Sequence, residues 1–449
     1  MKRKIYDRLL KWKEESQGRS AILIDGARRV GKSYIAKEFG KNEYETFILV
    51  DFNNLHPDLQ RIFDEYLTDR PNFFRYLSAY TGIKLVERRS LIIFDEVQQY
   101  PRARGAIKYL VEDGRYDYLE TGSLISINKN VKDIVIPSEE ERVKMYPMDF
   151  EEYLWAMGQS AIYDIIRESF YKKKPLGVLH RRAMSLFREY MAIGGMPQAV
   201  EAFAGGADFQ TVNHIKENIL NLYKADIAKY ADGQEYKVKA IFDLIPSQLN
   251  RHEKKFKVSD LAEGARMREY DTAFFWLSDS MIVNIAYNST EPNIGLRLNL
   301  DKTTLKCFMG DTGLLLTLAN GEAPGGENDL YRKFITNKLS VNHGMLMENI
   351  VAQMLIASGH DLFFFSSYSK TDSDSRMEID FLIRNREVTS RHNVRPIEVK
   401  SSTRYAYSSL DKFCDKYSQY VSNPTILHAD DYKEERGFIF MPLYMTPLL

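Results

Sequence analysis

A glycine-rich loop, GARRVGKS at residues 26–33, constrains the fold of this chain more than any other feature. It matches the pattern G-x-x-x-x-G-K-[ST] and stands between an apolar run, AILID at 21–25, and a helix-like stretch, SYIAKEF at 33–39. In such a strand–loop–helix setting, the glycines let the backbone wrap closely enough for its N–H groups to point at phosphate oxygens. The loop therefore predicts a nucleotide phosphate site at the carboxyl end of a strand.

The same loop supplies the expected contacts with ATP and Mg²⁺. Lys32 would reach the β- and γ-phosphates, and Ser33, at the start of the helix, would offer its hydroxyl to Mg²⁺. The loop residues expected to bind the nucleotide are Gly26, Ala27, Arg28, Arg29, Val30, Gly31, Lys32 and Ser33.

The run LIIFDE at 91–96 predicts the second half of the site. Its apolar residues carry Asp95 to the end of a buried strand, where this carboxylate can hold the Mg²⁺ shell together with Ser33. Glu96 then stands where it can orient and deprotonate a water molecule for attack on the γ-phosphate. Glutamate after aspartate favours ATP hydrolysis over transfer of the phosphoryl group to another acceptor.

A third polar position follows the run YDYLET at 116–121. Thr121 or Ser123 would come to the end of the next strand, where a hydroxyl can sense the γ-phosphate. A capped turn without any nucleotide contact gives the same spacing, so both interpretations stay open.

Short apolar runs alternate with helix-like stretches over roughly the first 120 residues. The four runs are AILID (21–25), FILVDF (47–52), LIIFD (91–95) and YDYLET (116–121). Near-continuous apolar runs of this length are typical of strands that are buried on both faces, and helical spacers are typical of parallel sheets. The pattern predicts an α/β fold with a parallel sheet.

The middle of the chain reads as mostly helical over 151–235, and it ends in a different pattern. Three short helices, the second capped by Ser259, precede two strand-like runs, and this order is typical of a winged helix-turn-helix as well as of other small α+β domains. The basic stretch RHEKKFK at 251–257 is either a phosphate contact or a solvated loop. The segment GEAPGGEND at 321–329 is the best candidate linker.

Two alternating strands near the C-terminus carry a second group of charges. MEIDFLI at 377–383 and PIEVK at 396–400 would present Asp380, Glu398 and Lys400 in one cleft. Asp380 and Glu398 could bind a divalent metal, Lys400 could steady an attacking water or a phosphate, and a helical acid, Glu348, could complete the metal shell. A surface pairing with a cross-strand ion pair would give the same alternation.

Together these motifs resemble the AAA+ ATPases whose C-terminal half is of the DUF4143 type. The resemblance extends to ERVKMYPMDFEEYL (141–154), IGGMPQAV (193–200), YKADI (223–227) and FMGDTGLL (308–315), and the C-terminal D…E-x-K pattern resembles a PD-(D/E)XK nuclease core. It implies a P-loop NTPase parallel sheet with a helical extension, a winged-helix middle domain and an α/β nuclease-like domain. The predicted boundaries are 1–205, 206–330 and 331–449.

The resemblance also implies a candidate arginine finger, Arg142, which would reach the γ-phosphate of a neighbouring subunit in an oligomer. A surface salt bridge is the alternative role for this side chain. Arg102, Arg104 and Arg115 compete for the same function.

The composition limits the kinds of molecule that the protein is expected to bind. The 62 basic and 62 acidic side chains balance, which excludes a general affinity for nucleic acid, so any such binding must come from a local basic surface. Only two cysteines occur, which excludes a disulfide framework and fits a cytoplasmic protein. The absence of an uninterrupted apolar stretch of membrane-spanning length leads us to expect no contact with a membrane.

The sequence thus predicts a Mg²⁺-dependent ATPase whose nucleotide state repositions a winged helix and a nuclease-like domain on nucleic acid, with DNA ahead of RNA. The alternative is an oligomerising ATPase switch whose nuclease-like domain is catalytically idle and binds only nucleic acid or a protein partner. A kinase or transport ATPase fits less well, because the chain has neither an acceptor signature nor an LSGGQ stretch.

Overall fold

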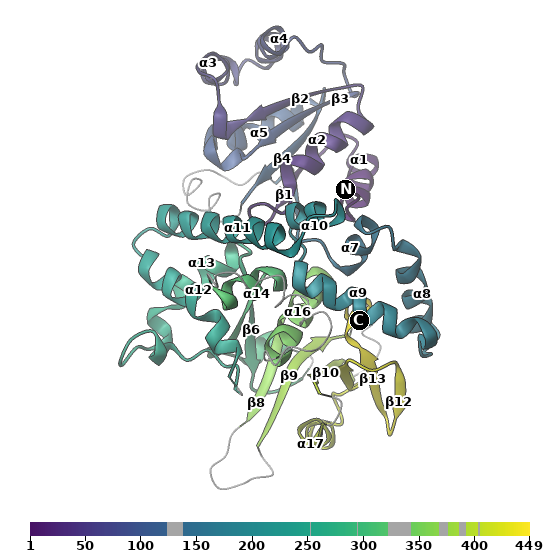
Figure 1. Cartoon of the computed structure of the whole chain (residues 1–449). Helices are drawn as coiled ribbons and strands as arrows, with labels where there is room; N and C mark the ends of the chain where they lie inside the picture. Colours follow the sequence, from purple (N-terminus) through teal and green to yellow (C-terminus); the bar gives the residue numbers. More distant parts are fainter. Residues whose placement is uncertain are drawn as a thin grey trace. The chain divides into compact units, whose positions relative to one another are not determined.

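A computed structural model describes residues 1–123, 138–251, 253–293, 295–321, 343–367, 376–385, 392–402 and 405–449. The chain divides into two compact units, Met1–Tyr146 (unit 1) and Pro147–Leu449 (unit 2) (Figure 1).

Unit 1 is built on a parallel sheet with the strand order β2-β3-β4-β1-β5. Its strands are β1 (Ala21–Asp25), β2 (Thr46–Asp51), β3 (Ser90–Asp95), β4 (Asp117–Gly122) and β5 (Glu140–Lys144). The four apolar runs of the sequence are the first four of these strands. The prediction of a parallel α/β sheet is therefore confirmed.

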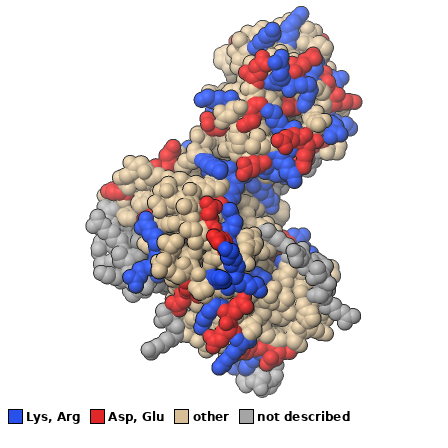
Figure 2. Space-filling view, turned by 90° about the vertical axis from the view of Figure 1, so that its right-hand side faces the viewer, with Lys and Arg blue, Asp and Glu red and all other residues tan. Residues whose placement is uncertain are grey.

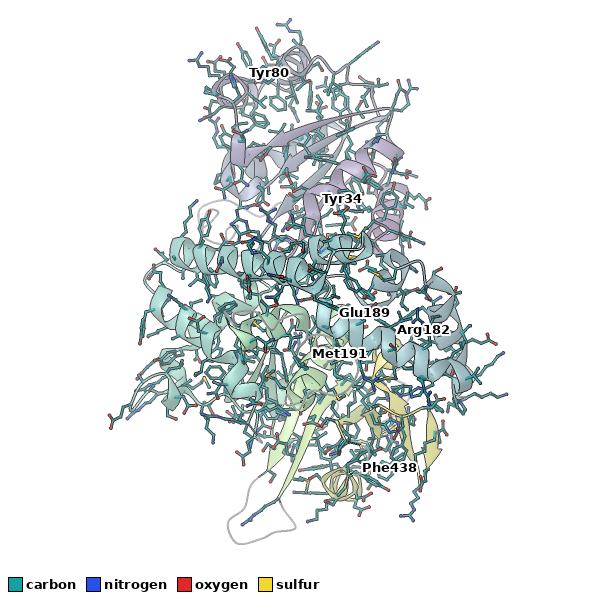
Figure 3. The ribbon with its side chains drawn as sticks, viewed as in Figure 1. Tyr34, Tyr80, Arg182, Glu189, Met191 and Phe438 are labelled. Carbon is teal, nitrogen blue, oxygen red and sulfur yellow. The ribbon has the colours of Figure 1, made fainter. Side chains whose placement is uncertain are left out.

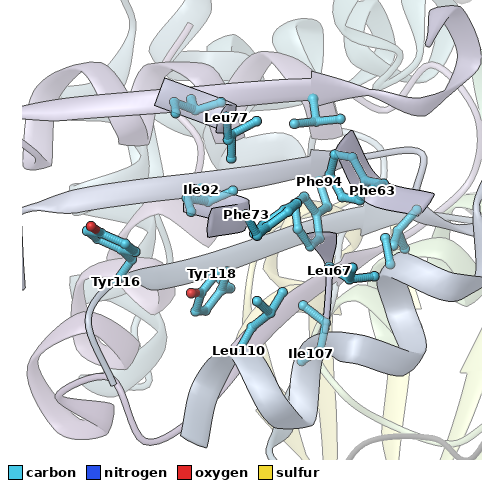
Figure 4. Close-up of a cluster of buried hydrophobic side chains, with 14 of the residues drawn as sticks. Phe63, Leu67, Phe73, Leu77, Ile92, Phe94, Ile107, Leu110, Tyr116 and Tyr118 are labelled. Atoms are coloured by element: carbon cyan, nitrogen blue, oxygen red, sulfur yellow. The ribbon is translucent and has the colours of Figure 1, made fainter. Parts of the chain in front are cut away.

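Helices cover both faces of this sheet. They are α1 (Ile5–Ser16), α2 (Lys32–Glu43), α3 (Pro57–Tyr66), α4 (Arg70–Thr81) and α5 (Pro101–Asp113), with 3₁₀ turns η1 (Phe52–Asn54) and η2 (Val97–Gln99). Figure 4 shows one core, in which side chains of α3, α4 and α5 pack on Ile92, Phe94 and Tyr118 of the sheet. The alternate strand residues, such as Ile22 and Ile93, are equally buried on the other face. Burial on both faces explains why these strands read as continuous apolar runs.

Unit 2 contains a mixed eight-stranded sheet with the order β12-β13-β11-β10-β9-β8-β6-β7. Its strands are β6 (Val283–Ser289), β7 (Leu300–Met309), β8 (Phe363–Ser367), β9 (Met377–Arg384), β10 (Val394–Val399), β11 (Thr425–His428), β12 (Lys433–Glu435) and β13 (Phe438–Pro442). Its helices are α7 (Phe150–Ala156), α8 (Ser160–Tyr171), α9 (His180–Ile193), α10 (Pro197–Ala204), α11 (Phe209–Tyr230), α12 (Glu235–Leu249), α13 (Asp271–Asp279), α14 (Thr312–Asn320), α16 (His343–Ala357) and α17 (Ser408–Lys416).

The region expected to form a winged helix differs in one element. The second predicted helix, after Ser259, is wrong, because this segment holds only the 3₁₀ turns Val258–Asp260 and Met267–Glu269. Gly264, with φ of +72°, lies between them in a left-handed conformation that interrupts helical geometry.

The predicted hairpin is present as β6 and β7, but β6 also pairs with β8, so the hairpin forms one edge of the C-terminal sheet. The winged-helix assignment and the boundaries at 205 and 330 stay predictions. The predicted linker at 321–329 lies outside the described residues except for Gly321.

A buried polar hub in unit 2 explains two motifs of the resemblance. Asp311, from FMGDTGLL, accepts hydrogen bonds from the backbone N–H of Gly195 (2.6 Å) and of Leu314 (2.9 Å). A Cβ atom at Gly195, from IGGMPQAV, would lie 2.1 Å from the carbonyl oxygen of Met148. Only glycine fits so close an approach, and these motif residues therefore join segments of unit 2 that are far apart in the sequence.

Helix α9 contributes further buried side chains to unit 2. Figure 3 labels Arg182, Glu189 and Met191 along the helix. Met191 is buried, and Glu189 accepts a hydrogen bond from the hydroxyl of Tyr153 on α7 (2.7 Å). In the part of the chain that the structure describes, none of the helices has the length and apolar character that crossing a bilayer would need.

Candidate functional site

The predicted phosphate loop connects β1 to α2, as expected. Gly31 caps α2 with φ of +100°, a conformation that favours glycine. A Cβ atom at Gly26 would lie 2.3 Å from the carbonyl oxygen of Met145, so this glycine allows the chain after β5 to pack against the loop. Arg28 and Arg29 are exposed, whereas Ala27 and Val30 are buried beneath them.

The loop is anchored by Arg3, a residue that sequence analysis missed. Its guanidinium donates hydrogen bonds to the carbonyl oxygens of Val30 (2.8 Å) and Tyr146 (2.7 Å), and the side chain is buried. A lone arginine ahead of an amphipathic helix gives no pattern from which this role could be read. Only the structure reveals the role of Arg3: its side chain is buried, and a buried charge requires partners.

Lys32 lies across the loop. Its Nζ donates to the carbonyl oxygens of Gly26 (2.9 Å) and Ala27 (3.0 Å), and the residue is only 5% exposed. Burial lowers the pKa of this ammonium, while the carboxylates of Glu96, Asp25 and Asp95 act in the opposite direction. The lysine thus stands between the loop backbone and a group of acids, where a polyphosphate would replace its carbonyl partners.

Asp95 collects two hydroxyl groups at the end of β3. Its Oδ1 accepts hydrogen bonds from Ser33 Oγ (2.7 Å) and Thr121 Oγ1 (2.5 Å), and the residue is 6% exposed. Ser33 and Asp95 were both expected to hold Mg²⁺, and the structure brings them into direct contact. Hydroxyl, carboxylate and phosphate oxygens are the ligands that Mg²⁺ prefers, so this donor set fits the ion.

Glu96 follows Asp95 in a left-handed conformation, with φ of +55°. Its N–H donates to Thr121 Oγ1 (3.1 Å), and its carboxylate accepts from Gln98 Nε2 (2.5 Å). Thr121, rather than Ser123 just beyond β4, is thus the hydroxyl that joins Asp95 to Glu96. Gln98 was not predicted, and its position after D-E is the signal that could have drawn attention to it.

The arginine-finger candidate lies on an edge strand. Arg142 Nε donates to Glu140 Oε1 (2.8 Å), and the side chain is 35% exposed. Arg104 also contacts Glu140 (2.9 Å) but is fully buried, so it is unable to reach another subunit. Beside them, burial and then the Glu140 charge raise the pKa of Glu120 well above its usual range. Arg142 stays a prediction.

The expected C-terminal site residues come from the predicted elements. Glu348 lies on α16, Asp380 on β9 and Glu398 on β10, followed by Lys400. Asp380 Oδ2 accepts a hydrogen bond from the N–H of Val399 (2.9 Å), and Lys400 Nζ contacts Glu398 Oε2 (2.5 Å).

Two further lysines enter this cluster. Lys306 of β7 places its Nζ 3.1 Å from Glu378 Oε1, 3.5 Å from Asp380 Oδ1 and 3.9 Å from Glu348 Oε2. Lys254, from the basic stretch at 251–257, forms an ion pair with Glu348. Sequence analysis missed Lys306, although a lysine directly before the apolar residues CFM at 307–309 is itself a sign of a buried charge pair.

The electrostatics of the cluster reflect this crowding. Burial and then the Asp380 charge raise the pKa of Glu348 to about 7 and that of Glu398 to about 7. Burial also acts to raise the pKa of Asp380, but Lys306 and Lys254 outweigh it, so that this pKa is lowered. Among the described residues, His, Cys, Asp and Glu side chains form no group of three or more that could hold a metal ion.

Three stretches of the chain match known families. Residues 18–154 match an AAA domain, residues 184–324 match a domain of unknown function, DUF8612, and residues 343–445 match a domain of unknown function, DUF4143. A search of curated proteins finds no match.

Several solved structures are similar to the chain at low scores. A Walker-type ATPase from Pyrococcus abyssi is 16% identical with a TM-score of 0.38, and the match covers 71% of this chain and 95% of that one. The Orc1 protein of Aeropyrum pernix in complex with DNA is 11% identical with a TM-score of 0.26, over 71% and 92% of the two chains. Cdc6p from Pyrobaculum aerophilum is 11% identical with a TM-score of 0.25, over 75% and 93%. These scores support no inference about function.

The AAA domain match agrees with the parallel sheet and with the contacts among Lys32, Ser33 and Asp95. The DUF4143 match falls on the elements that carry Glu348, Asp380 and Glu398. The chain therefore combines a P-loop ATPase domain of the AAA class with a C-terminal DUF4143 region.

Proposed function

We propose that the protein hydrolyses ATP with the help of Mg²⁺. The observation that carries this proposal is the contact of Ser33 and Thr121 with one oxygen of Asp95, at the end of the phosphate loop. In this arrangement Ser33 and Asp95 would hold the ion, whose chemistry is to neutralise charge on the phosphates. Thr121 keeps the Asp95 carboxylate oriented.

The remaining residues divide the other tasks. Lys32 exchanges its loop carbonyl partners for the β- and γ-phosphates, and the N–H groups of the loop surround the phosphate oxygens. Glu96 orients a water molecule and accepts its proton during attack on the γ-phosphate. Gln98, which donates to the Glu96 carboxylate, sets the direction of that side chain.

The test is steady-state ATP hydrolysis by the full chain, together with binding of a fluorescent ATP analogue. Glu96→Gln is expected to lower turnover by about 10²–10⁴-fold while it leaves binding intact. Lys32→Ala is expected to lose both binding and turnover, whereas Lys37→Ala, an exposed lysine of the same helix, changes neither. Unchanged turnover in Glu96→Gln would contradict the assigned role of Glu96.

Hydrolysis in oligomers is a second part of the proposal. The Arg142 side chain is 35% exposed on the edge strand β5. There the γ-phosphate of a nucleotide bound to a neighbouring subunit could replace Glu140 as the partner of the guanidinium. Size-exclusion chromatography with light scattering, on Glu96→Gln with ATP, would show assembly if this is correct. The role is supported if Arg142→Ala lowers turnover to the extent that the wild-type chain assembles under the same conditions. A wild-type chain that stays monomeric and still has full turnover would exclude the role.

For unit 2 we propose nucleic-acid binding, with DNA ahead of RNA. The support is the resemblance of its D…E-x-K elements to a nuclease core. On the face that Figure 2 shows, basic and acidic side chains are interspersed. Binding would thus depend on local lysines, and Lys255 and Lys257 are candidates because they flank Lys254, which pairs with Glu348 of the acidic cluster.

Fluorescence anisotropy with duplex DNA and RNA of one sequence tests this part. Joint replacement of Lys255 and Lys257 by glutamate is expected to weaken binding and its salt dependence, while Lys239→Glu on the exposed side of α12 does not. Equal binding by both variants would exclude this surface.

Cutting and binding without cutting remain the two candidate functions of unit 2. The lysines that contact Glu348 and Asp380 favour binding without cutting. Metal-dependent plasmid cleavage by wild type that Glu398→Ala abolishes would instead establish a nuclease.

A further inference from the structure

We infer that Lys306 takes the place of a divalent metal ion in the acidic cluster of unit 2, so that this site holds a fixed ammonium group and binds no Mg²⁺. The inference concerns unit 2 alone and does not depend on ATP hydrolysis in unit 1. It goes beyond the resemblance, which implies a metal there.

The first argument is position. Lys306 Nζ lies 3.5 Å from Asp380 Oδ1 and 3.9 Å from Glu348 Oε2, oxygens of two carboxylates that the sequence led us to expect as metal ligands. Mg²⁺ binds oxygen at about 2.0–2.1 Å and Ca²⁺ at about 2.3–2.6 Å. An ion at such distances from both carboxylates would occupy the volume that the ammonium group fills.

The second argument is that the ammonium group of Lys306 is enclosed by other side chains. Lys306 is 1% exposed, and its Nζ lies 5.1 Å from the centroid of the Phe364 ring on β8. Its third carboxylate partner, Glu378, completes a set of acids around it at 3.1 Å. Moving the lysine out of this site would remove a positive charge from three carboxylates that lie together in poorly solvated surroundings, which is strongly unfavourable.

The third argument is that Glu348, Glu398 and Asp380 each already have at least one other charged or hydrogen-bonding partner. Lys254 pairs with Glu348, Lys400 pairs with Glu398, and the N–H of Val399 donates to Asp380. Three ammonium groups therefore face the carboxylates of Glu348, Glu378, Asp380 and Glu398. A divalent ion would add positive charge to a cluster that lysines have already neutralised almost completely.

The test measures Mn²⁺ binding by the full chain without nucleotide, by the electron paramagnetic resonance signal of free Mn²⁺. Asp95→Asn is the background, because it removes the expected metal ligand of unit 1. In this background the free Mn²⁺ signal is expected to equal that of buffer. Mn²⁺ binding that disappears when Asp380→Asn is added would overturn the inference, and this comparison needs no change at Lys306.

A second pair of variants tests the substitution itself. Lys306→Met in the Asp95→Asn background is expected to gain Mn²⁺ binding and to unfold at a higher temperature with Mn²⁺ than without it. Lys302→Met, which removes an exposed lysine from the same strand, is expected to do neither. A folded Lys306→Met variant that takes up no Mn²⁺ would show that Lys306 is not what excludes the ion.

Discussion

Acidic side chains gather at two places in this protein, and their partners differ in kind. At the nucleotide site Asp95 receives hydrogen bonds from the hydroxyls of Ser33 and Thr121. In unit 2 Asp380 faces the ammonium group of Lys306. A hydroxyl is neutral and can turn to coordinate a metal ion beside the carboxylate, whereas a buried ammonium group supplies the positive charge itself. The partner of a carboxylate thus decides whether an acidic cluster is open to a metal.

The largest expected effect is at the first site. Asp95→Asn removes a charge that the Mg²⁺ shell requires, and we expect ATP turnover to fall by at least about 100-fold. Asp51→Asn is the matched control, because Asp51 ends the neighbouring strand in register with Asp95 but is exposed. Turnover assays at saturating ATP compare the two, and similar losses in both would contradict the assignment of Asp95.

The second effect is on stability. Lys306→Met leaves buried carboxylates without their cation, and we expect the free energy of unfolding of unit 2 to fall by about 3–5 kcal/mol. Lys302→Met should stay within about 0.5 kcal/mol of wild type, because it changes an exposed position. The measurement is chemical denaturation in which the unfolding of unit 2 is monitored by hydrogen exchange of the β9 amides. It compares the free energy of unfolding of the two variants. A loss below about 1 kcal/mol in Lys306→Met would show that the acids do not depend on this lysine.

These two sites also show how far sequence reasoning reaches. The apolar runs predicted β1–β4 to within one residue at each end, because strands buried on both faces leave an unbroken pattern. The loop, Asp95 and Glu96 were found because their spacing along the chain is local. Thr121 and Ser123 were equivalent by spacing, and only the position of β4 beside β3 selects Thr121.

The rest depended on contacts between distant segments. Lys306 meets Glu348 and Asp380 only after β7 and β9 have joined one sheet, so no local pattern predicts the ion pairs. The basic stretch at 251–257 was weighed as a phosphate contact or a solvated loop, yet its Lys254 is a partner of Glu348. The prediction of a helix after Ser259 was wrong because Gly264 takes a left-handed conformation there.

A smaller effect concerns the anchor of the phosphate loop. Arg3→Ala removes the hydrogen bonds to Val30 and Tyr146, so the loop loses part of its fixed geometry. We expect the KM for ATP to rise about tenfold, equivalent to roughly 1.4 kcal/mol, with little change in turnover at saturation. Lys11→Ala, an exposed residue of α1, serves as the control. An unchanged KM would mean that the loop holds its shape without Arg3.

The last effect is a pH dependence in unit 1. Because the pKa of Glu120 is raised in the folded state, the folded protein binds more protons than the unfolded one above the ordinary glutamate range. Stability from this group is therefore present at low pH and is lost as the pH rises toward the raised pKa. Relative to wild type, Glu120→Gln should gain stability with increasing pH, by up to about 1.4 kcal/mol per pH unit. Parallel stability curves between pH 5 and 8 would exclude a raised pKa.

The most direct test of the contrast between the two sites is the number of Mn²⁺ ions bound by the wild-type chain, measured with and without a non-hydrolysable ATP analogue. The account predicts that Mn²⁺ binds only together with the nucleotide, as a single ion per chain. Mn²⁺ bound without nucleotide that persists in Asp95→Asn, or a second ion in the presence of nucleotide, would contradict the claim that a lysine replaces the metal in unit 2.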